Sequence, residues 1–208
     1  MHLQVALDFD DLDRAIKLAH EAVRGGADWI EVGTPLIKAE GMNAIRRIKK
    51  EFPDKTIIAD MKIMDVGGIE VEMAAKSGAD VVVILGLADD STIKEAVNSA
   101  RKYGVKIMAD LINVENMPER AVELEAMDVD YICIHVGIDQ QMRGISPIEM
   151  TKKVAEVVAN SEIAIAGGLN SETVADAIKA GANIIIVGHA ITAAKDAEKA
   201  TKLILEAM

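Results

Sequence analysis

The sequence predicts a single (β/α)8 barrel, a TIM barrel of the α/β class, that spans residues 1–208 as one domain. Eight short apolar runs rich in β-branched residues alternate with stretches of helical periodicity. Successive runs begin about one strand–loop–helix–loop unit apart, and no linker or shift in composition interrupts them. An open doubly wound sheet is the alternative, but it usually has a glycine-rich turn after its first strand, and residues 6–13 (ALDFDDLD) contain no glycine.

The predicted strands are rich in Val, Ile, Leu and Ala, which suit a sheet buried on both faces. They cover residues 3–7, 28–32, 56–60, 80–85, 105–110, 130–135, 162–166 and 183–187. Residues 11–24 form the clearest helix, because their apolar side chains follow the three- and four-residue spacing of one helix face. Further helices are expected at 89–103 after an Asp/Ser cap, at 171–180 beginning with Ser171, and at 193–207.

Three segments resemble one another, at residues 25–33 (GGADWIEVG), 77–86 (SGADVVVILG) and 180–188 (AGANIIIVG), and residues 127–137 are a looser copy. Each of the three places a glycine at a predicted helix end, then a small residue, then a strand that ends in glycine. A repeated βα unit is expected when one unit cannot bury its own apolar face and must stack on its neighbours.

Composition restricts the classes of function. The net charge of −11 argues against a surface for nucleic acid or anionic membranes, because such surfaces recruit Lys and Arg. Aromatic residues make up 2%, too few for stacking along a single nucleic-acid strand. No apolar run approaches a membrane span, the N-terminus lacks the features of a signal peptide, and the one cysteine, Cys133, lies in an apolar run as an inert core thiol. We therefore expect a cytoplasmic protein with no nucleic-acid or membrane partner.

Titratable residues end five of the predicted strands. They are Asp8, Glu31, Asp60, Asp110 and His135. The carboxyl ends of all strands meet at one rim of a barrel, and the active sites of this fold class lie there. Helix capping or loop solvation explains one such residue equally well, but five on one rim indicate a site.

The acidic residues of this rim need a counter-charge, because unpaired buried carboxylates are costly and repel one another. The set comprises Asp8, Glu31, Asp60 and the nearby Asp65. Lys62 faces the same way as Asp60 if the strand continues through it, and its acidic neighbours favour an ammonium over a Schiff-base nucleophile. A hard divalent cation such as Mg²⁺ suits all-oxygen ligands and would supply the remaining charge.

Two turns that contain glycine predict a phosphate site. Gly167 and Gly168 follow the seventh strand, and Gly188 and His189 follow the eighth. Barrels of this class often bind phosphate in these two loops, where backbone N–H groups converge and glycine allows close approach. Arg143 is interpreted as a solvated loop charge, with a contact to phosphate as the alternative.

Residues 59–65 (ADMKIMD) carry the most specific motif. Asp60-x-Lys62-x-x-Asp65, preceded by a first strand that ends in ALD at Asp8, resembles the orotidine-monophosphate decarboxylase suprafamily. The resemblance covers essentially the whole chain and is strongest for its 3-hexulose-6-phosphate synthase family, through EVGTPLIKAEG (31–41), ILGLADDSTI (84–93), HVGIDQQ (135–141), AGG (166–168) and VGHAI (187–191).

Two positions separate the branches of this suprafamily, and a third departs from the pattern of the synthases. The orotidine decarboxylases carry lysine on the second strand and use no metal, whereas Glu31 resembles the magnesium-dependent members. The 3-keto-L-gulonate-6-phosphate decarboxylases have a His-Arg-x-x-Asp motif after the sixth strand. Residues 135–139 (HVGID) resemble this motif but lack its arginine. Gly188 and His189 stand where the synthases often have two glycines.

The resemblance implies a Mg²⁺-dependent aldehyde-lyase, an aldolase of the ribulose monophosphate pathway. It would condense formaldehyde reversibly with D-ribulose 5-phosphate to give 3-hexulose 6-phosphate through a metal-stabilised enediolate. The decarboxylase of 3-keto-L-gulonate 6-phosphate is one alternative, and a non-catalytic barrel that binds sugar phosphates is another.

The resemblance also implies roles for the residues of the rim. Glu31 and Asp60 would bind the metal, His135 would take a proton from the sugar, and Lys62 would stabilise oxyanion charge. Asp8 and Asp65 would bind sugar hydroxyls and position Lys62, and Asp65 would reach into the site of a second subunit in a homodimer with shared active sites. The substrate- and phosphate-binding residues would be Gly167, Gly168, Gly188, His189 and, as a weaker candidate, Asp110.

Overall fold

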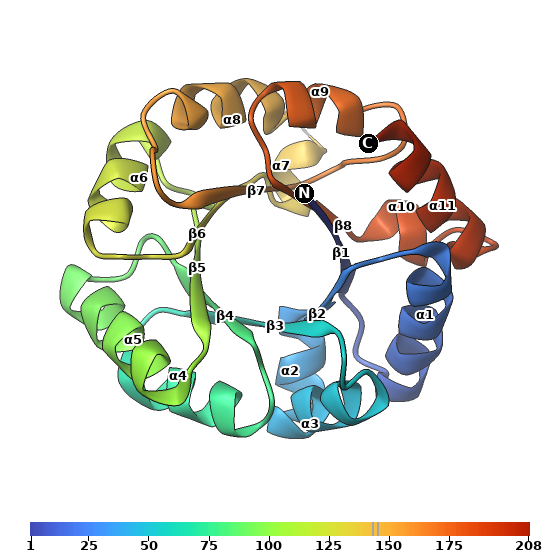
Figure 1. Ribbon diagram of the computed structural model, residues 1–208, viewed down its shortest axis with the longest axis horizontal. Coiled ribbons are helices and arrows are strands. Elements are labelled where there is room, and N and C mark those ends of the chain that lie inside the picture. Colours follow the sequence, from blue (N-terminus) through green and yellow to red (C-terminus); the bar gives the residue numbers. More distant parts are fainter. Residues whose placement is uncertain (143, 145) are drawn as a thin grey trace.

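The computed structural model describes residues 1–142, 144 and 146–208, and it is a closed barrel of eight parallel strands that neighbour one another in sequence order (Figure 1). The predicted fold class is confirmed. The strands are β1 (His2–Leu7), β2 (Trp29–Val32), β3 (Thr56–Ile63), β4 (Val81–Leu85), β5 (Lys106–Asp110), β6 (Tyr131–His135), β7 (Glu162–Ala166) and β8 (Ile184–Val187). Each predicted strand coincides with one of these within a few residues.

Helices form a ring outside the strands (Figure 1). They are α1 (Leu12–Gly25), α2 (Thr34–Glu40), α3 (Met42–Glu51), α4 (Gly67–Lys76), α5 (Asp90–Tyr103), α6 (Met117–Ala126), α7 (Ile138–Gln141), α8 (Ile148–Ala155), α9 (Val174–Lys179), α10 (His189–Thr192) and α11 (Ala197–Ala207). No helix in the described part of the chain is long and apolar enough to cross a bilayer.

Two predicted helices begin later than expected. The prediction of 171–180 is too long, because the Asn170 side chain accepts from the Glu172 N–H and the Thr173 hydroxyl accepts from the Asn170 N–H. These bonds form a turn, and α9 begins only after it. The prediction of 193–207 is replaced by the short α10 followed by α11, which Asp196 caps by accepting the Lys199 N–H.

The repeated segments explain how the units of the barrel are joined. In the three closest copies, Gly26, Gly78 and Gly181 have φ of 107°, 99° and 106°, so each adopts the left-handed conformation that ends a helix. The acidic or amide residue two positions later accepts a backbone N–H from the start of the preceding strand. These bonds are Asp28 with Leu3 (3.0 Å), Asp80 with Ile57 (2.8 Å) and Asn183 with Ile163 (2.9 Å), and the looser copy supplies Asp130 with Ile107 (2.9 Å). Each copy of the repeat thus joins two neighbouring strands at their N-terminal ends through a side-chain-to-backbone hydrogen bond.

Apolar side chains fill both sides of the sheet. Between strands and helices lies the larger core, and a smaller cluster fills the barrel interior. At the N-terminal end of the interior, Trp29 stacks on His2 with 4.8 Å between ring centroids and meets Tyr131 edge-on at 5.5 Å. Cys133 lies in the same interior, and burial raises the pKa of its thiol well above the usual value, as expected of an inert core residue. The polar rim lies at the opposite, C-terminal end.

The barrel closes where the first helix meets the last. Gly25 ends α1 against α11, and a Cβ atom there would lie 2.5 Å from Thr201 Cβ and 2.6 Å from the Glu198 carbonyl oxygen. The backbone carbonyl cannot move aside as a flexible side chain can, so a side chain at Gly25 must push the two helices apart.

We expect Gly25→Ala to lower the free energy of unfolding by about 1–3 kcal/mol, the range for overpacking a buried contact. Lys17→Ala on the exposed face of the same helix is the matched control and is expected to change stability little. Urea unfolding followed by circular dichroism measures both. Equal stabilities for the two variants would contradict the proposed close contact.

Candidate active site

Three carboxylates meet at the C-terminal rim of the barrel. Asp8 follows β1, Glu31 lies on β2 and Asp60 lies on β3, and one oxygen from each lies within 4.8 Å of those of the other two. Glu31 and Asp60 are buried, whereas Asp8 reaches solvent. Three oxygen donors this close fit a hard divalent cation better than they fit one another. The sequence predicts these three residues in one cluster, and the structure brings them together.

The electrostatics of this carboxylate group disfavour its fully ionised form. Burial raises the pKa of Glu31 well above the ordinary range, and repulsion from Asp60 and Asp8 adds to the effect. Loss of surrounding solvent in the concave rim and repulsion from Asp60 also raise the pKa of Asp8. A bound cation would remove the repulsion that causes part of both shifts.

Lys62 supplies the positive charge beside this group. Its Nζ lies 2.9 Å from Asp60 Oδ1 and 2.9 Å from Asp110 Oδ2. The strand continues through Lys62, as the alternation argument required, but it bulges between Ala59 and Ile63, and Lys62 has a φ of 46°. Burial alone would lower the pKa of Lys62, but Asp60 and Asp110 outweigh it and raise that pKa, so the amine stays charged.

Asp110 connects the lysine to the histidine. At the end of β5, its Oδ2 lies 2.8 Å from His135 Nδ1 and also accepts from Lys62, while its Oδ1 accepts the Ile112 N–H at 2.9 Å. Burial would raise the pKa of Asp110, but the hydrogen bond and charge of His135 and the charge of Lys62 lower it to about 2. The sequence predicts Asp110 as a weaker, substrate-binding candidate, and the structure places its carboxylate between Lys62 and His135, in contact with both side chains.

The sequence analysis did not single out three residues that support the carboxylates. The Thr34 hydroxyl donates to Asp60 Oδ2 at 2.7 Å, and Gln4 Nε2 donates to Glu31 Oε2 at 2.5 Å. A Cβ atom at Gly33 would overlap Asp8 Oδ1, so only glycine leaves room for that carboxylate. The polarity of Gln4 inside an apolar strand was the one signal in the sequence that pointed to such a role.

The glycine turn after β7 has the geometry that close approach requires. Gly167 and Gly168 have φ of 116° and 70°, and a Cβ atom at Gly167 would overlap the Val136 carbonyl oxygen. After β8, Gly188 lies beside the carboxylate group, since its Cβ would be 3.5 Å from Asp8 Oδ2. His189 is exposed at the start of α10. The two predicted phosphate turns therefore flank the rim on the side away from Lys62 and Asp110 in the strand order.

One predicted site residue, Asp65, stands apart from this cluster. Asp65 is exposed, and its Oδ1 accepts the Val66 N–H, so within one chain it does not join the three carboxylates. Arg143 lies outside the described residues, and its interpretation stays a prediction.

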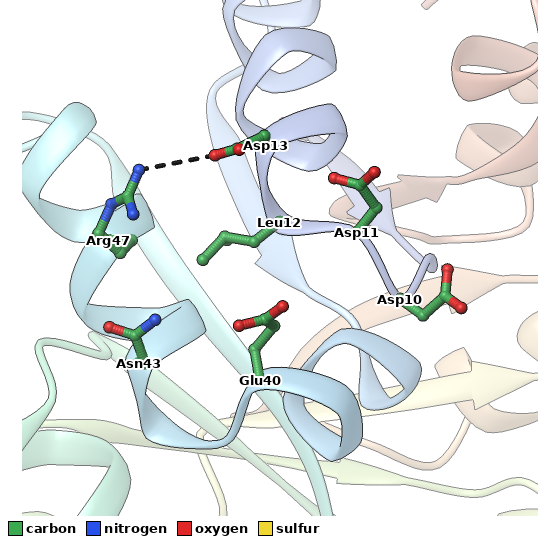
Figure 2. A pocket seen from close by; sticks show the side chains of 7 residues that line it. All are labelled: Asp10, Asp11, Leu12, Asp13, Glu40, Asn43 and Arg47. Carbon is green, nitrogen blue, oxygen red and sulfur yellow. Dashed lines mark ion pairs between the residues drawn. The ribbon is translucent and has the colours of Figure 1, made fainter.

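A separate cavity of about 500 Å³ lies between the start of α1 and the α2–α3 region (Figure 2). It is lined by Asp10, Asp11, Leu12, Asp13, Glu40, Asn43 and Arg47. Figure 2 shows Arg47 directed toward Asp13, and the two side chains are 3.8 Å apart. Because four of the seven lining residues are carboxylates, an anionic phosphate does not suit this cavity.

The fold and the site define an enzyme of the (β/α)8-barrel class, with acidic, lysine and histidine side chains gathered where the strands end. Residues 1–204 match the model of the orotidine 5'-phosphate decarboxylase / HUMPS family, and the chain belongs to this family. A 3-hexulose-6-phosphate synthase of Bacillus subtilis is 43% identical over 204 residues, which are 98% of this chain and 97% of the relative. The chain is therefore an enzyme of the carbon–carbon lyase class.

Solved structures agree with this assignment. The 3-hexulose-6-phosphate synthase of Salmonella typhimurium superposes with a TM-score of 0.95 at 38% identity, covering 100% of this chain and 98% of the other. A 3-keto-L-gulonate-6-phosphate decarboxylase of Vibrio cholerae has a TM-score of 0.88 at 25% identity, covering 99% and 96%. The chain thus shares its fold with both and more of its sequence with the synthase.

The raised pKa values of Glu31 and Asp8 predict that cation binding depends on pH. In the metal-free folded protein these groups keep protons at a pH where the unfolded chain has lost them, so stability falls as pH rises through that window. A cation must displace those protons. We therefore expect affinity for Mn²⁺ or Mg²⁺ to rise from mildly acidic to slightly alkaline pH, with release of protons.

Calorimetric titration of the metal-free protein, in two buffers that differ in ionisation enthalpy, measures both the affinity and the protons released. Glu31→Gln is the control, since it removes one of the titrating groups, and it should release fewer protons. An affinity that is independent of pH, with no proton release, would contradict the assignment of a cation to these carboxylates.

Proposed function

We propose that this protein is a 3-hexulose-6-phosphate synthase that condenses formaldehyde reversibly with D-ribulose 5-phosphate, and that it depends on Mg²⁺. The observation that carries the proposal is the grouping of Asp8, Glu31 and Asp60 beside Lys62 at the rim of the barrel. Relatives at 43% and 38% identity are named 3-hexulose-6-phosphate synthase, and this likeness supports the proposal.

Glu31 and Asp60 are the proposed metal ligands, with Asp8 beside them to bind a ligand water or a sugar hydroxyl. A divalent cation held by these residues would supply the positive charge needed to polarise a sugar carbonyl and to stabilise the negative charge that develops when C1 loses its proton. The three carboxylates offer only oxygen atoms as ligands, and an all-oxygen ligand set suits Mg²⁺ better than zinc.

His135 is the proposed base for the proton on C1 of the sugar. Asp110 accepts the hydrogen of Nδ1, so the lone pair of the neutral imidazole lies on Nε2, the atom that takes the proton. The ionised Asp110 then stabilises the imidazolium that forms. Lys62, held by Asp60 and Asp110, directs a fixed positive charge toward the developing oxyanion.

The sugar phosphate binds, in this proposal, to the backbone of the two glycine turns. Gly167 and Gly168 form the turn after β7, with positive φ and with the Gln141 side chain beside them, and His189 provides an exposed imidazole after Gly188. Phosphate at one side of the rim and the cation at the other would hold the sugar across it.

We also propose a homodimer with shared active sites, formed through an apolar surface at β3 and α4. This α4 surface consists of Met64, Val66, Ile69 and Met73, whose side chains are 44–62% exposed. Exposed apolar patches of this kind indicate an interaction site. Asp65 lies within the surface, so a second copy bound there would bring Asp65 toward the rim of the partner.

Formaldehyde-dependent consumption of ribulose 5-phosphate tests the proposed reaction. We expect activity that excess chelator abolishes and Mg²⁺ restores, and a loss of more than about a hundredfold in Asp60→Asn and in His135→Ala. Lys179→Ala on exposed α9 is the control and should retain activity. Release of CO₂ from 3-keto-L-gulonate 6-phosphate at a higher rate would favour the decarboxylase, and binding of ribulose 5-phosphate without either reaction would favour a non-catalytic barrel.

Mixed dimers test the shared site. Asp65→Ala and Lys62→Ala subunits should each be inactive alone, but a heterodimer restores one complete site and should recover part of the wild-type activity. Two affinity tags isolate the heterodimer, and light scattering measures its mass. An isolated heterodimer with no recovered activity would contradict the contribution of Asp65 to the partner subunit.

A further inference from the structure

Gln4 is a polar side chain in an apolar part of the barrel. It lies on β1 with its side chain fully buried, and its register partners are Trp29 on β2 and Ile186 on β8. Glu31 is in register with Ala6, two residues further along β1, so Gln4 approaches Glu31 from the N-terminal side, beneath the rim. Burying a carboxamide there costs free energy unless its polar atoms find partners.

Only one of the two polar atoms of Gln4 has a partner. Nε2 donates to Glu31 Oε2 at 2.5 Å, and it is the one hydrogen-bond donor to the Glu31 carboxylate among the described residues. Oε1 is the single buried side-chain nitrogen or oxygen atom in the described part of the chain that lacks a protein partner. Reversing the amide would set Oε1 against the carboxylate oxygen and lose the bond. The contact with Glu31 therefore fixes the orientation of the amide, although Oε1 is left without a hydrogen-bond partner.

We infer that Gln4 is a positioning residue for Glu31, which prepares the carboxylate for the divalent cation; this inference rests on the proposed function. The bond to Nε2 fixes Oε2, and with it the orientation of the carboxylate that meets those of Asp8 and Asp60. Hydrogen-bond partners behind metal ligands orient them in this way, and their loss weakens metal binding.

The other buried ligand shows why Gln4 matters. Asp60 is held by Lys62 and by the Thr34 hydroxyl, so the loss of one contact leaves another. Among the described residues, Gln4 is the only one that donates a hydrogen bond to the Glu31 side chain. Without this bond the Glu31 side chain regains rotamer freedom, and the cation must then order it on binding.

Metal binding by the stripped full-length protein tests the inference without relying on activity. Gln4→Met keeps the volume of the side chain and removes the donor, and Gln4→Leu provides a second apolar replacement. We expect each to weaken Mn²⁺ binding, measured by electron paramagnetic resonance, by about ten- to a hundredfold. Met108→Leu alters another buried side chain of the barrel interior and should bind Mn²⁺ as the wild type does.

A double variant links the effect to Glu31. In a Glu31→Gln background, Gln4→Met should cause little further loss of Mn²⁺ affinity, because its target is already altered. Circular dichroism and thermal unfolding without metal confirm that each variant folds. Wild-type affinity in a folded Gln4→Met or Gln4→Leu protein would overturn the inference, as would unfolding of both, which would show that Gln4 serves the core. Failure of the wild-type protein itself to bind Mn²⁺ would instead remove the proposed function on which the inference rests.

Discussion

The structure depends on one electrostatic constraint, the crowding of Asp8, Glu31 and Asp60 at the end of an otherwise apolar barrel. Like charges this close cannot all be ionised without a counter-charge, and burial strengthens the repulsion because little water screens it. Lys62 supplies part of this counter-charge from one side of the group. Lys62 contacts both Asp60 and Asp110, and Asp110 also contacts His135. A continuous series of charge-assisted hydrogen bonds therefore runs from the carboxylates to the histidine.

The barrel makes this crowding possible by fixing the backbone that carries each group. Strands β1, β2 and β3 pair in a regular parallel register, with Ala6 opposite Glu31 and Glu31 opposite Ile58. Side-chain-to-backbone hydrogen bonds join neighbouring strands at their N-terminal ends, where apolar and aromatic side chains fill the interior. Above this floor, β3 departs from regular geometry at the bulge that carries Lys62, whose side chain contacts Asp60. Regular packing thus supports the rigid placement of groups that repel one another.

Residues at strand ends could be predicted from the sequence, because their polarity interrupts an apolar pattern and the fold class fixes where strand ends meet. Asp60, Lys62 and His135 were found in this way and lie within one network. The bridging position of Asp110 was not predicted, since it depends on distances across three strands that no periodicity encodes. The same applies to Thr34, because a threonine at the start of a helix is common and only the hydrogen bond from its hydroxyl to Asp60 assigns it to the site. The turn before α9 was missed because Ser171 has the properties of a helix cap, while the actual turn is closed by Asn170 and Thr173.

An acidic protein that binds a sugar phosphate must separate its two kinds of charge. The rim does so by strand order, with carboxylates after β1 and on β2, β3 and β5, and glycine turns after β7 and β8. The separation is incomplete, because Gly188 lies beside Asp8, and a phosphate there would face a carboxylate. A proton on Asp8, which its raised pKa favours, or a cation beside it would remove that repulsion. Binding of cation and binding of phosphate would then assist each other, because each lowers the electrostatic cost of placing the other in the rim.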